Sequence, residues 1–268
     1  MSQRWCSLPQ GRTTQPSRTQ ATTYLLTVVM PVVCWYTGIQ PPSFFFYEIM
    51  KIFLDTADTD LIRKYYTTGL IDGVTTNPSL IRKSGRDPEE VYQEIKDIGV
   101  NDISMEVVGD SPEMTVEGRR LFYKYGQECT VKVPCTPDGL LTCKELSREL
   151  IKVNVTLIFS TAQAILAAKA GATYVSPFVG RLDDNSVLGV QLIKSISDIY
   201  RVHNVHKTQI LSASIRNVTS VSQSFANGAH IVTMPPSVFD KMYNHVLTDK
   251  GLQIFDEDFK KTQELINK

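Results

Sequence analysis

Several features that would assign this chain to a familiar class are missing from its sequence. Basic and acidic residues balance at 28 each, so nothing points to nucleic acid or an anionic membrane as a partner. The five cysteines contain no C-x-x-C pair, and the four histidines lack the spacing of metal ligands. We therefore expect no metal site, and we interpret the cysteines as small thiols in a reducing compartment such as the cytoplasm.

Glycine-rich phosphate-binding loops are missing as well. The turn after the first predicted strand contains no G-x-G-x-x-G, and G-x-x-x-x-G-K-[ST] occurs nowhere in the chain. Such loops bind nucleotide phosphates through their backbone N–H groups. Their absence weakens the case for a nucleotide-binding α/β protein.

The first 47 residues lack lysine and acidic residues. They are rich in Ser, Thr, Gln and Pro, they turn apolar at 23–39, and their charged side chains are Arg4, Arg12 and Arg18. From Met50 onward the sequence is charged and periodic. We place a boundary there and expect a disordered leader over 1–49 and a globular domain over 50–268.

Three interpretations of this leader remain open. A basic, Ser/Thr-rich segment without acidic residues resembles an organelle transit peptide. A basic stretch before an uncharged one resembles a signal peptide or anchor, although Pro31 interrupts the apolar run, which is about as short as a spanning helix can be. Alternatively, Met50 is the true start of the protein. The first interpretation implies an organelle, and the last implies the cytoplasm.

Short β-branched runs alternate with amphipathic stretches from Met50 onward. The predicted strands are 51–57, 73–77, 102–108, 129–135, 152–159, 174–179, 207–215 and 229–235. Helical patterns lie between them, with N-caps expected at 111–114 and 160–163. Eight such units predict a parallel (β/α)₈ barrel rather than an open sheet. Residues 251–268 predict an extra, mostly polar helix beyond the barrel.

Lys132 lies between two valines in one of these strands. A buried ammonium must be paired, must reach solvent, or must give up its proton, and a lysine that gives up its proton near pH 7 is a nucleophile. Most of the other strands also include polar residues near their carboxyl ends, where barrels carry their chemistry. These residues are Asp55, Thr75, Asn77, Glu106, Asn154, Thr156, Ser176, Ser212 and Ser214.

Two carboxylates and two arginines complete the candidate chemistry. Asp55 and Glu106 could each be a salt-bridge partner, but with Lys132 they also fit aldol-type cleavage through a Schiff base. Arg181 and Arg216 could cap helix ends. Together with a nearby serine they could instead bind a phosphate at the rim of the late strands.

Five motifs, in order along five strands, strongly resemble the small, single-barrel branch of the transaldolase family. They are FLDTAD, GVTTNPSLI, TVKVPCTPDGL, NVTLIFS and SPFVGRLDD, and the resemblance runs from about Met50 to the C-terminus without touching the leader. It implies a (β/α)₈ barrel that transfers a dihydroxyacetone unit between sugar phosphates in the pentose phosphate pathway, without a cofactor.

The resemblance also implies a role for each site residue. Lys132 corresponds to the Schiff-base lysine and Asp55 to the acid/base at the cleaved bond. Glu106 and Thr156 correspond to the pair that holds the catalytic water. The sugar and phosphate contacts correspond to Thr75, Asn77, Asn154, Ser176, Phe178, Arg181, Ser214 and Arg216.

Two other functions remain as alternatives. Fructose-6-phosphate aldolases of the same superfamily typically carry glutamine at the place of Glu106 and tyrosine at the place of Phe178, which makes transfer the preferred interpretation here. A non-catalytic barrel that only binds sugar phosphates would be marked by a lost lysine or aspartate, and both are present. The resemblance further implies a ring-type homo-oligomer in which 251–268 packs on a neighbour.

Overall fold

The structure is a computed structural model that describes residues 50–267. The predictions made for residues 1–49 lie outside the described residues. From Met50 the chain forms one compact unit. No helix in the described part of the chain is long and apolar enough to cross a membrane.

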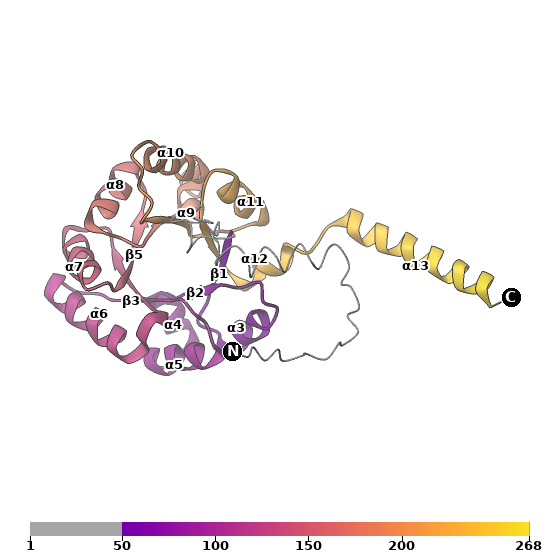
Figure 1. Cartoon of the computed structure of the whole chain (residues 1–268), viewed down its shortest axis with the longest axis horizontal. Helices are drawn as coiled ribbons and strands as arrows, with labels where there is room; N and C mark the ends of the chain where they lie inside the picture. Colours follow the sequence, from indigo (N-terminus) through magenta and orange to yellow (C-terminus); the bar gives the residue numbers. More distant parts are fainter. Residues whose placement is uncertain (1–49, 268) are drawn as a thin grey trace, which may run out of the picture. The chain divides into compact units, whose positions relative to one another are not determined.

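Eight parallel strands, hydrogen-bonded in sequence order, close into a barrel (Figure 1). This confirms the predicted (β/α)₈ fold. The register places Glu106 opposite Lys132, and Lys132 opposite Asn154, on neighbouring strands. The strands are β1 Lys51–Asp55, β2 Gly73–Thr75, β3 Ile103–Glu106, β4 Cys129–Pro134, β5 Lys152–Ile158, β6 Tyr174–Pro177, β7 Gln209–Ser212 and β8 Ile231–Met234.

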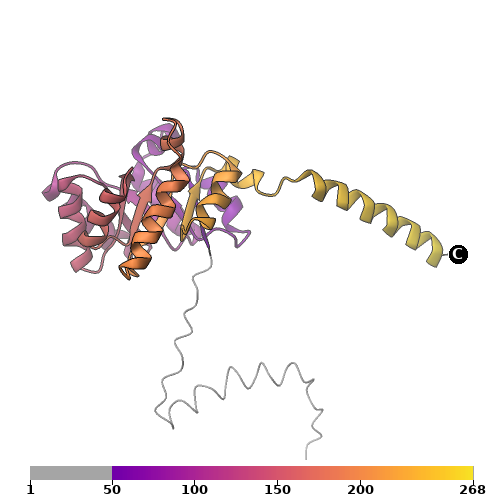
Figure 2. The same cartoon turned by 90° about the horizontal axis from the view of Figure 1, so that it is seen from above.

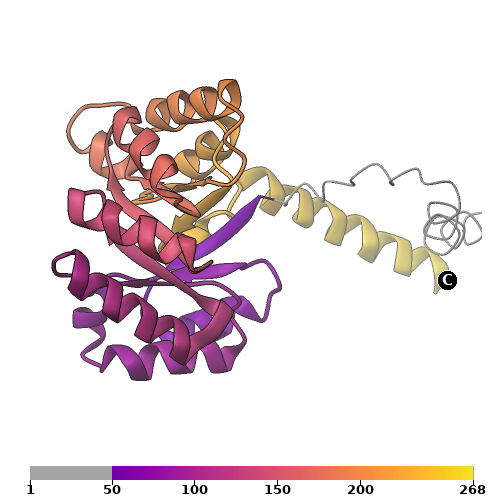
Figure 3. The same ribbon diagram turned by 60° about the vertical axis from the view of Figure 1, so that its left-hand side comes forward.

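Helices surround the barrel and cover its outer face (Figures 1, 2 and 3). Outward-facing side chains such as Val131 and Val133 are fully buried beneath them. The helices are α3 Thr59–Tyr66, α4 Pro78–Ser84, α5 Pro88–Ile98, α6 Ser111–Tyr125, α7 Pro137–Arg148, α8 Thr161–Ala170, α9 Val179–Asp183, α10 Gly189–Val202, α11 Val218–Ala226 and α12 Pro236–Lys241. A 3₁₀ turn, η2 Gly126–Glu128, follows α6.

The predicted helix caps are partly right. Ser160 caps α8 as expected, because its hydroxyl accepts from the N–H of Gln163. The cap of α6 is Asp110 rather than Ser111. Its carboxylate accepts from the N–H of Glu113, whose side chain in turn accepts from the N–H of Asp110. The aspartate is therefore the residue that satisfies the open end of this helix.

All eight predicted strands exist, and each of them ends one to three residues earlier than predicted. The strand predicted over 174–179 ends at Pro177, and the one predicted over 207–215 ends at Ser212. The backbone hydrogen bonds between strands stop where the loop to the next helix begins. These loops keep β-branched or apolar residues because they are buried around the site, so their composition resembles that of a strand.

The interior of the barrel holds a small apolar cluster, separate from the core beneath the helices. It consists of Phe53, Tyr174, Leu211, Ala213 and Ile231. Phe53 has room only because Gly73, on the next strand, has no side chain: a Cβ there would lie 2.6 Å from the Phe53 ring. The cluster fills the barrel beneath the polar residues at its carboxyl end.

A polar cluster closes the amino end of the barrel. Asp102 accepts hydrogen bonds from Thr130 Oγ1, Lys152 Nζ and the Tyr174 hydroxyl, each at 2.8 Å. The contacts join residues near the starts of β3, β4, β5 and β6, so this charge is buried but paired. We assign it to stability, because chemistry in this fold lies at the opposite end.

The predicted C-terminal helix is present as α13 Val246–Ile266. It begins five residues before the predicted 251–268, because His245 caps it by accepting from the N–H of Leu247 at 3.2 Å. None of its residues is buried. Large apolar side chains are nevertheless present, and those exposed along it are Val246, Leu247, Leu252, Ile254, Phe255, Phe259, Leu265 and Ile266.

Candidate active site

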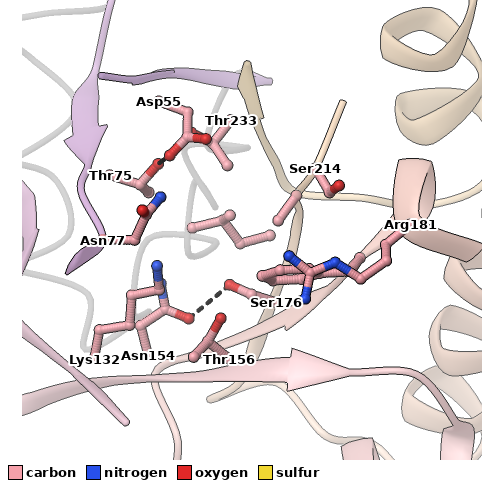
Figure 4. Close-up of a pocket in the computed structure, with 13 residues that line it drawn as sticks. Asp55, Thr75, Asn77, Lys132, Asn154, Thr156, Ser176, Arg181, Ser214 and Thr233 are labelled. Atoms are coloured by element: carbon pink, nitrogen blue, oxygen red, sulfur yellow. Dashed lines mark hydrogen bonds between the residues drawn. The ribbon is translucent and has the colours of Figure 1, made fainter. Parts of the chain in front are cut away.

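Two adjoining pockets open at the carboxyl ends of the strands. The inner pocket is a cavity of about 120 Å³ (Figure 4), and the outer pocket, about 760 Å³ in volume, widens toward the rim. The outer volume is in the range of sites that hold small molecules. The inner cavity is lined by Asp55, Thr75, Asn77, Lys132, Asn154, Thr156, Ser176, Phe178, Arg181, Leu211, Ala213, Ser214 and Thr233.

Ser212, one of the polar residues noted near the strand ends, lines neither pocket, and its hydroxyl lies 2.9 Å from Ser224 Oγ. The two pockets bring together the other twelve sequence-predicted site residues. Ten of them line the inner cavity, and Glu106 and Arg216 line the outer one. Lys132, Asp55 and Thr156 belong to both pockets, so the two form one continuous site. The roles assigned to these residues stay predictions.

Lys132 is almost completely buried, with 7% of its side chain exposed. Its Nζ lies 3.0 Å from Glu106 Oε2 and donates to the backbone carbonyl of Thr76 at 2.9 Å. Of the fates expected for a buried lysine, pairing is therefore the one seen here. The two contacts fix Nζ at the edge of the cavity, beside a carboxylate that can take its proton.

Asp55 ends β1 and receives a chain of hydrogen bonds. Thr75 Oγ1 donates to Asp55 Oδ1 at 2.8 Å and lies 2.6 Å from Thr233 Oγ1. Because a hydroxyl has only one proton, Thr233 must donate to Thr75. Burial raises the pKa of Asp55, and the Lys132 charge and the Thr75 hydrogen bond oppose this effect. A raised pKa makes the carboxylate a better proton acceptor.

Two amides present N–H groups to the cavity. Asn154 Oδ1 accepts from Ser176 at 2.6 Å, and its Nδ2 donates to Ser104 Oγ at 3.2 Å, which leaves one N–H without a partner in the described part of the chain. Asn77 Oδ1 caps α4 by accepting from the N–H of Leu80 at 3.0 Å, so its NH₂ group remains available. Both amides are thus oriented to donate to the hydroxyls of a ligand.

Thr156 has a buried hydroxyl without a hydrogen-bond partner among residues 50–267. A buried, unpaired polar group costs about 1–3 kcal/mol. The strand register shifts between Val155 and Ile158, and Leu157 adopts a positive φ of 60°. Such irregularities redirect side chains beside active sites. We interpret Thr156 as a partner for a water molecule or a substrate oxygen next to Lys132.

The two predicted phosphate-binding arginines lie in different environments. The Arg181 guanidinium stacks over the Phe178 ring at 5.0 Å from its centroid, and Phe159 packs edge-on against the same ring. Arg216 instead forms an ion pair with Asp184, with 2.7 Å between Nη2 and Oδ2. Aromatic stacking holds Arg181 in place while its N–H edge stays open to a ligand.

A family model described as "Transaldolase/Fructose-6-phosphate aldolase" matches residues 52–267. The chain belongs to this family. It is 54% identical over 218 residues to a protein of Paracoccus denitrificans named "Probable transaldolase", a match that covers 81% of this chain and all of that protein. A protein of the same name from Nitrosopumilus maritimus is 51% identical over 215 residues, covering 80% of this chain and 96% of that one.

More distant similarity extends to the fold alone. A flavocytochrome b2 mutant with benzoylformate superposes with a TM-score of 0.53 at 14% identity, covering 70% of this chain and 57% of that one. At this identity the comparison supports the barrel and nothing about its chemistry. The predicted resemblance to the transaldolase family is confirmed by the family match. The match covers the full length of a 218-residue relative, which agrees with the predicted small, single-barrel branch of the family.

Sequence reasoning missed three residues around the site of this family member. Thr233 hydrogen-bonds to Thr75 in the cavity, Ser104 supports Asn154, and the Thr76 carbonyl positions Lys132. Thr233 could have been found, because it is a polar residue inside the apolar strand run of 229–235. Thr76 acts through its backbone, which leaves no signal in the sequence.

Proposed function

We propose that the chain is a transaldolase that moves a dihydroxyacetone unit from a ketose phosphate to an aldose phosphate. The donors would be sedoheptulose 7-phosphate or fructose 6-phosphate, and the acceptors glyceraldehyde 3-phosphate or erythrose 4-phosphate. The observation that carries the proposal is the buried Lys132, which faces one cavity with Asp55 and lies 3.0 Å from Glu106. The names of the relatives from Paracoccus and Nitrosopumilus support the same activity.

In the first step Lys132 would form an imine with the ketone of the donor. Its neutral amine attacks C2, the resulting carbinolamine loses its hydroxyl as water, and a protonated imine remains. Glu106, 3.0 Å from Nζ, would take the proton that the lysine must lose, and the Thr156 hydroxyl, which has no partner among residues 50–267, would hold the water. The same water returns later to hydrolyse the imine.

In the second step the bond between C3 and C4 breaks. Asp55 takes the proton of the C4 hydroxyl, the C4 oxygen becomes an aldehyde, and the bond electrons move into the iminium to give a neutral enamine. The aldose phosphate leaves. The enamine carbon then attacks the aldehyde carbon of the acceptor and forms a new C–C bond. Asp55 returns its proton to the aldehyde oxygen, which becomes the new hydroxyl. No further electron sink is needed.

The remaining polar groups would hold the sugar along the barrel axis. Asn77 and Asn154 offer N–H groups to hydroxyls near the reacting carbons. Through their hydrogen bonds Thr75 orients Asp55 and Ser176 orients Asn154. Arg181 and Arg216 line the outer pocket and Ser214 lines the inner one, and together they would bind the phosphate. The phosphate would thereby fix the distance of the carbonyl from Lys132.

A coupled assay with fructose 6-phosphate tests the proposal. Glyceraldehyde 3-phosphate should be released in many turnovers only when erythrose 4-phosphate is present, because the enamine must be collected by an acceptor. Release at the same rate without acceptor would identify the enzyme as an aldolase instead. No release under either condition would contradict both activities.

An aldolase activity is the second candidate, and Phe178 is the residue that opposes it. The ring lines the cavity, where it offers no proton to the enamine carbon. We expect Phe178→Tyr to raise acceptor-free cleavage and to lower transfer, because the added hydroxyl can supply that proton. A change of about 1.4 kcal/mol in relative barriers is tenfold in rate. The measurement is the ratio of acceptor-free to acceptor-dependent turnover.

Phe159→Tyr is the matched control for this prediction. Phe159 contacts the Phe178 ring but lines neither pocket, so its added hydroxyl should leave the ratio unchanged. An unchanged ratio in a folded Phe178→Tyr enzyme that still forms the imine would show that Phe178 does not control the fate of the enamine.

We propose that α13 packs against a second copy of the chain. Its apolar side chains gather on one face, since Leu247, Ile254, Phe255, Phe259 and Ile266 repeat at helical spacing, and none of them is buried. Exposed apolar faces of this length mark association sites. A symmetric assembly would bury them without requiring another protein.

Changing one residue on this face should dissociate the assembly. We expect Phe255→Glu to reduce the mass in solution toward the 30.1 kDa of a single chain, because the new charge would have to be buried against the partner. Gln253→Glu adds the same charge on the opposite side of α13 and should leave the assembly intact. Light scattering after gel filtration measures both, and an unchanged mass for Phe255→Glu would exclude this face.

A further inference from the structure

The ion pair between Arg216 and Asp184 lies at the rim of the outer pocket. Both side chains are more than half exposed, at 57% and 53%, and their charged atoms are 2.7 Å apart. Arg216 lines the pocket, whereas Asp184 directly follows α9 at the edge of the site. The pair therefore uses the N–H edge of an arginine that faces the proposed phosphate position.

Arg216 has a second contact besides Asp184, because its side chain packs closely against the backbone at Gly180. Its side chain crosses Gly180, where a Cβ would lie 2.7 Å from Arg216 Cγ and 2.1 Å from the carbonyl of Ser214. The absence of a side chain at Gly180 is what lets the arginine run along α9 toward the pocket. Asp184 is anchored separately, through its N–H to the Gly180 carbonyl at 2.9 Å. Removing the Asp184 charge should leave the guanidinium near the rim.

Arg181, the other arginine of the site, has no such partner among residues 50–267. No carboxylate lies within ion-pair distance of Arg181 in the part of the chain that the structure describes, and its guanidinium stacks on Phe178 instead. One arginine of the pair is thus open to an anion, and the other is already occupied by an anion of the protein itself.

We infer that Asp184 is an internal competitor for the phosphate group of the sugar substrates. It occupies Arg216 in the empty site, gives way when a phosphate binds, and returns when the phosphate leaves. The inference rests on the proposed function, which places the phosphate at Arg181 and Arg216. Exposed ion pairs of this kind add little stability, so a phosphate dianion that also contacts Arg181 can displace the carboxylate.

Competition at Arg216 suits a reaction in which two aldose phosphates must pass through one site. In each turnover the first aldose phosphate must leave before the acceptor can enter, while the enamine stays on Lys132. A carboxylate that pairs with Arg216 again as the phosphate leaves lowers the free-energy barrier to dissociation of the aldose phosphate. Asp184 would therefore weaken phosphate binding and speed product release, without touching the reacting atoms.

Binding of inorganic phosphate tests the inference without any turnover. We expect Asp184→Asn to lower the dissociation constant of inorganic phosphate about two- to five-fold, the range of an exposed ion pair, as measured by titration calorimetry. Asp198→Asn is the control, because it removes another exposed carboxylate, which pairs with Arg201 at 2.8 Å and with Lys194 at 2.9 Å on α10, away from both pockets. It should leave phosphate binding unchanged.

Arg216→Ala separates this inference from the proposed function. It should weaken phosphate binding, and Asp184→Asn should have no further effect in its presence, because the two residues act through the same contact. If Arg216→Ala binds phosphate as well as the unchanged protein, the proposed phosphate position is wrong and the inference fails with it. If Arg216→Ala weakens binding but Asp184→Asn does not tighten it, only the inference is overturned.

Kinetics add a readout that a structural role of Asp184 would not change. Asp184→Asn should lower the KM for glyceraldehyde 3-phosphate without raising kcat, because tighter binding and slower release accompany each other. The KM for unphosphorylated glyceraldehyde as acceptor should not change. An equal change in KM for both acceptors would show that Asp184 acts on the site as a whole rather than on the phosphate.

Discussion

Lys132→Arg is expected to abolish turnover completely. A guanidinium stays protonated at any pH at which the protein is folded, so it cannot attack a ketone, although it can still pair with Glu106. Lys132→Met is a second variant, similar in length and without a charge, in case the larger guanidinium does not fit. Circular dichroism and the melting temperature should show that at least one of the two variants is folded.

Lys152→Arg is the matched control. Lys152 also forms an ion pair inside the barrel, at 2.8 Å from Asp102, but it lies at the amino end, away from both pockets. This variant should keep its transfer activity. A loss of activity equal to that of Lys132→Arg would mean that any change to a lysine in the barrel is harmful, and the prediction would then not single out Lys132.

Chemical trapping identifies the lysine directly. Borohydride added together with fructose 6-phosphate should inactivate the enzyme and leave a reduced three-carbon unit on Lys132, detectable by mass spectrometry. A label on another lysine would show that the mechanism is wrong. A protein that binds sugar phosphates without reacting would take up no label, so the same experiment also tests the alternative of a non-catalytic barrel.

The barrel could be predicted from the sequence because its strands and helices differ in period and composition. Each strand is a short β-branched run, and most of the helices have one apolar face, so the eight repeats determine the topology without any long-range information. The family could be predicted because five short motifs occur in order on five strands. Both predictions are confirmed, by the closed parallel sheet and by the family match.

The interactions inside the site could not be predicted in the same way. The sequence placed Lys132 and Glu106 on neighbouring strands, but their direct contact depends on the register, which places them opposite each other. The pairing of Arg216 with Asp184 depends on how the chain turns after α9, and no periodic pattern reports such a turn. The leader, the roles of the site residues and the assembly through α13 stay predictions.

Replacing Asp55 should separate imine formation from carbon–carbon cleavage. Asp55→Asn keeps an oxygen that can accept from Thr75 but removes the base for the C4 hydroxyl, and loss of a general base costs about 10²–10⁴-fold in rate. Lys132 is untouched, so the imine should still form and should accumulate. Borohydride trapping should therefore label Lys132 while turnover collapses.

The pH dependence gives a second test of Asp55. Burial raises the pKa of this carboxyl, so the base is protonated, and activity is lost, at a higher pH than for an ordinary aspartate as the pH falls. The acid limb of the kcat/KM profile should lie above the usual aspartate range and should disappear in Asp55→Asn. The exposed Asp60 on α3 provides the control, since Asp60→Asn should keep both the rate and the acid limb. Near-normal activity in Asp55→Asn would exclude Asp55 as the base, and the proton of the C4 hydroxyl would then have to go to Glu106 across the cavity.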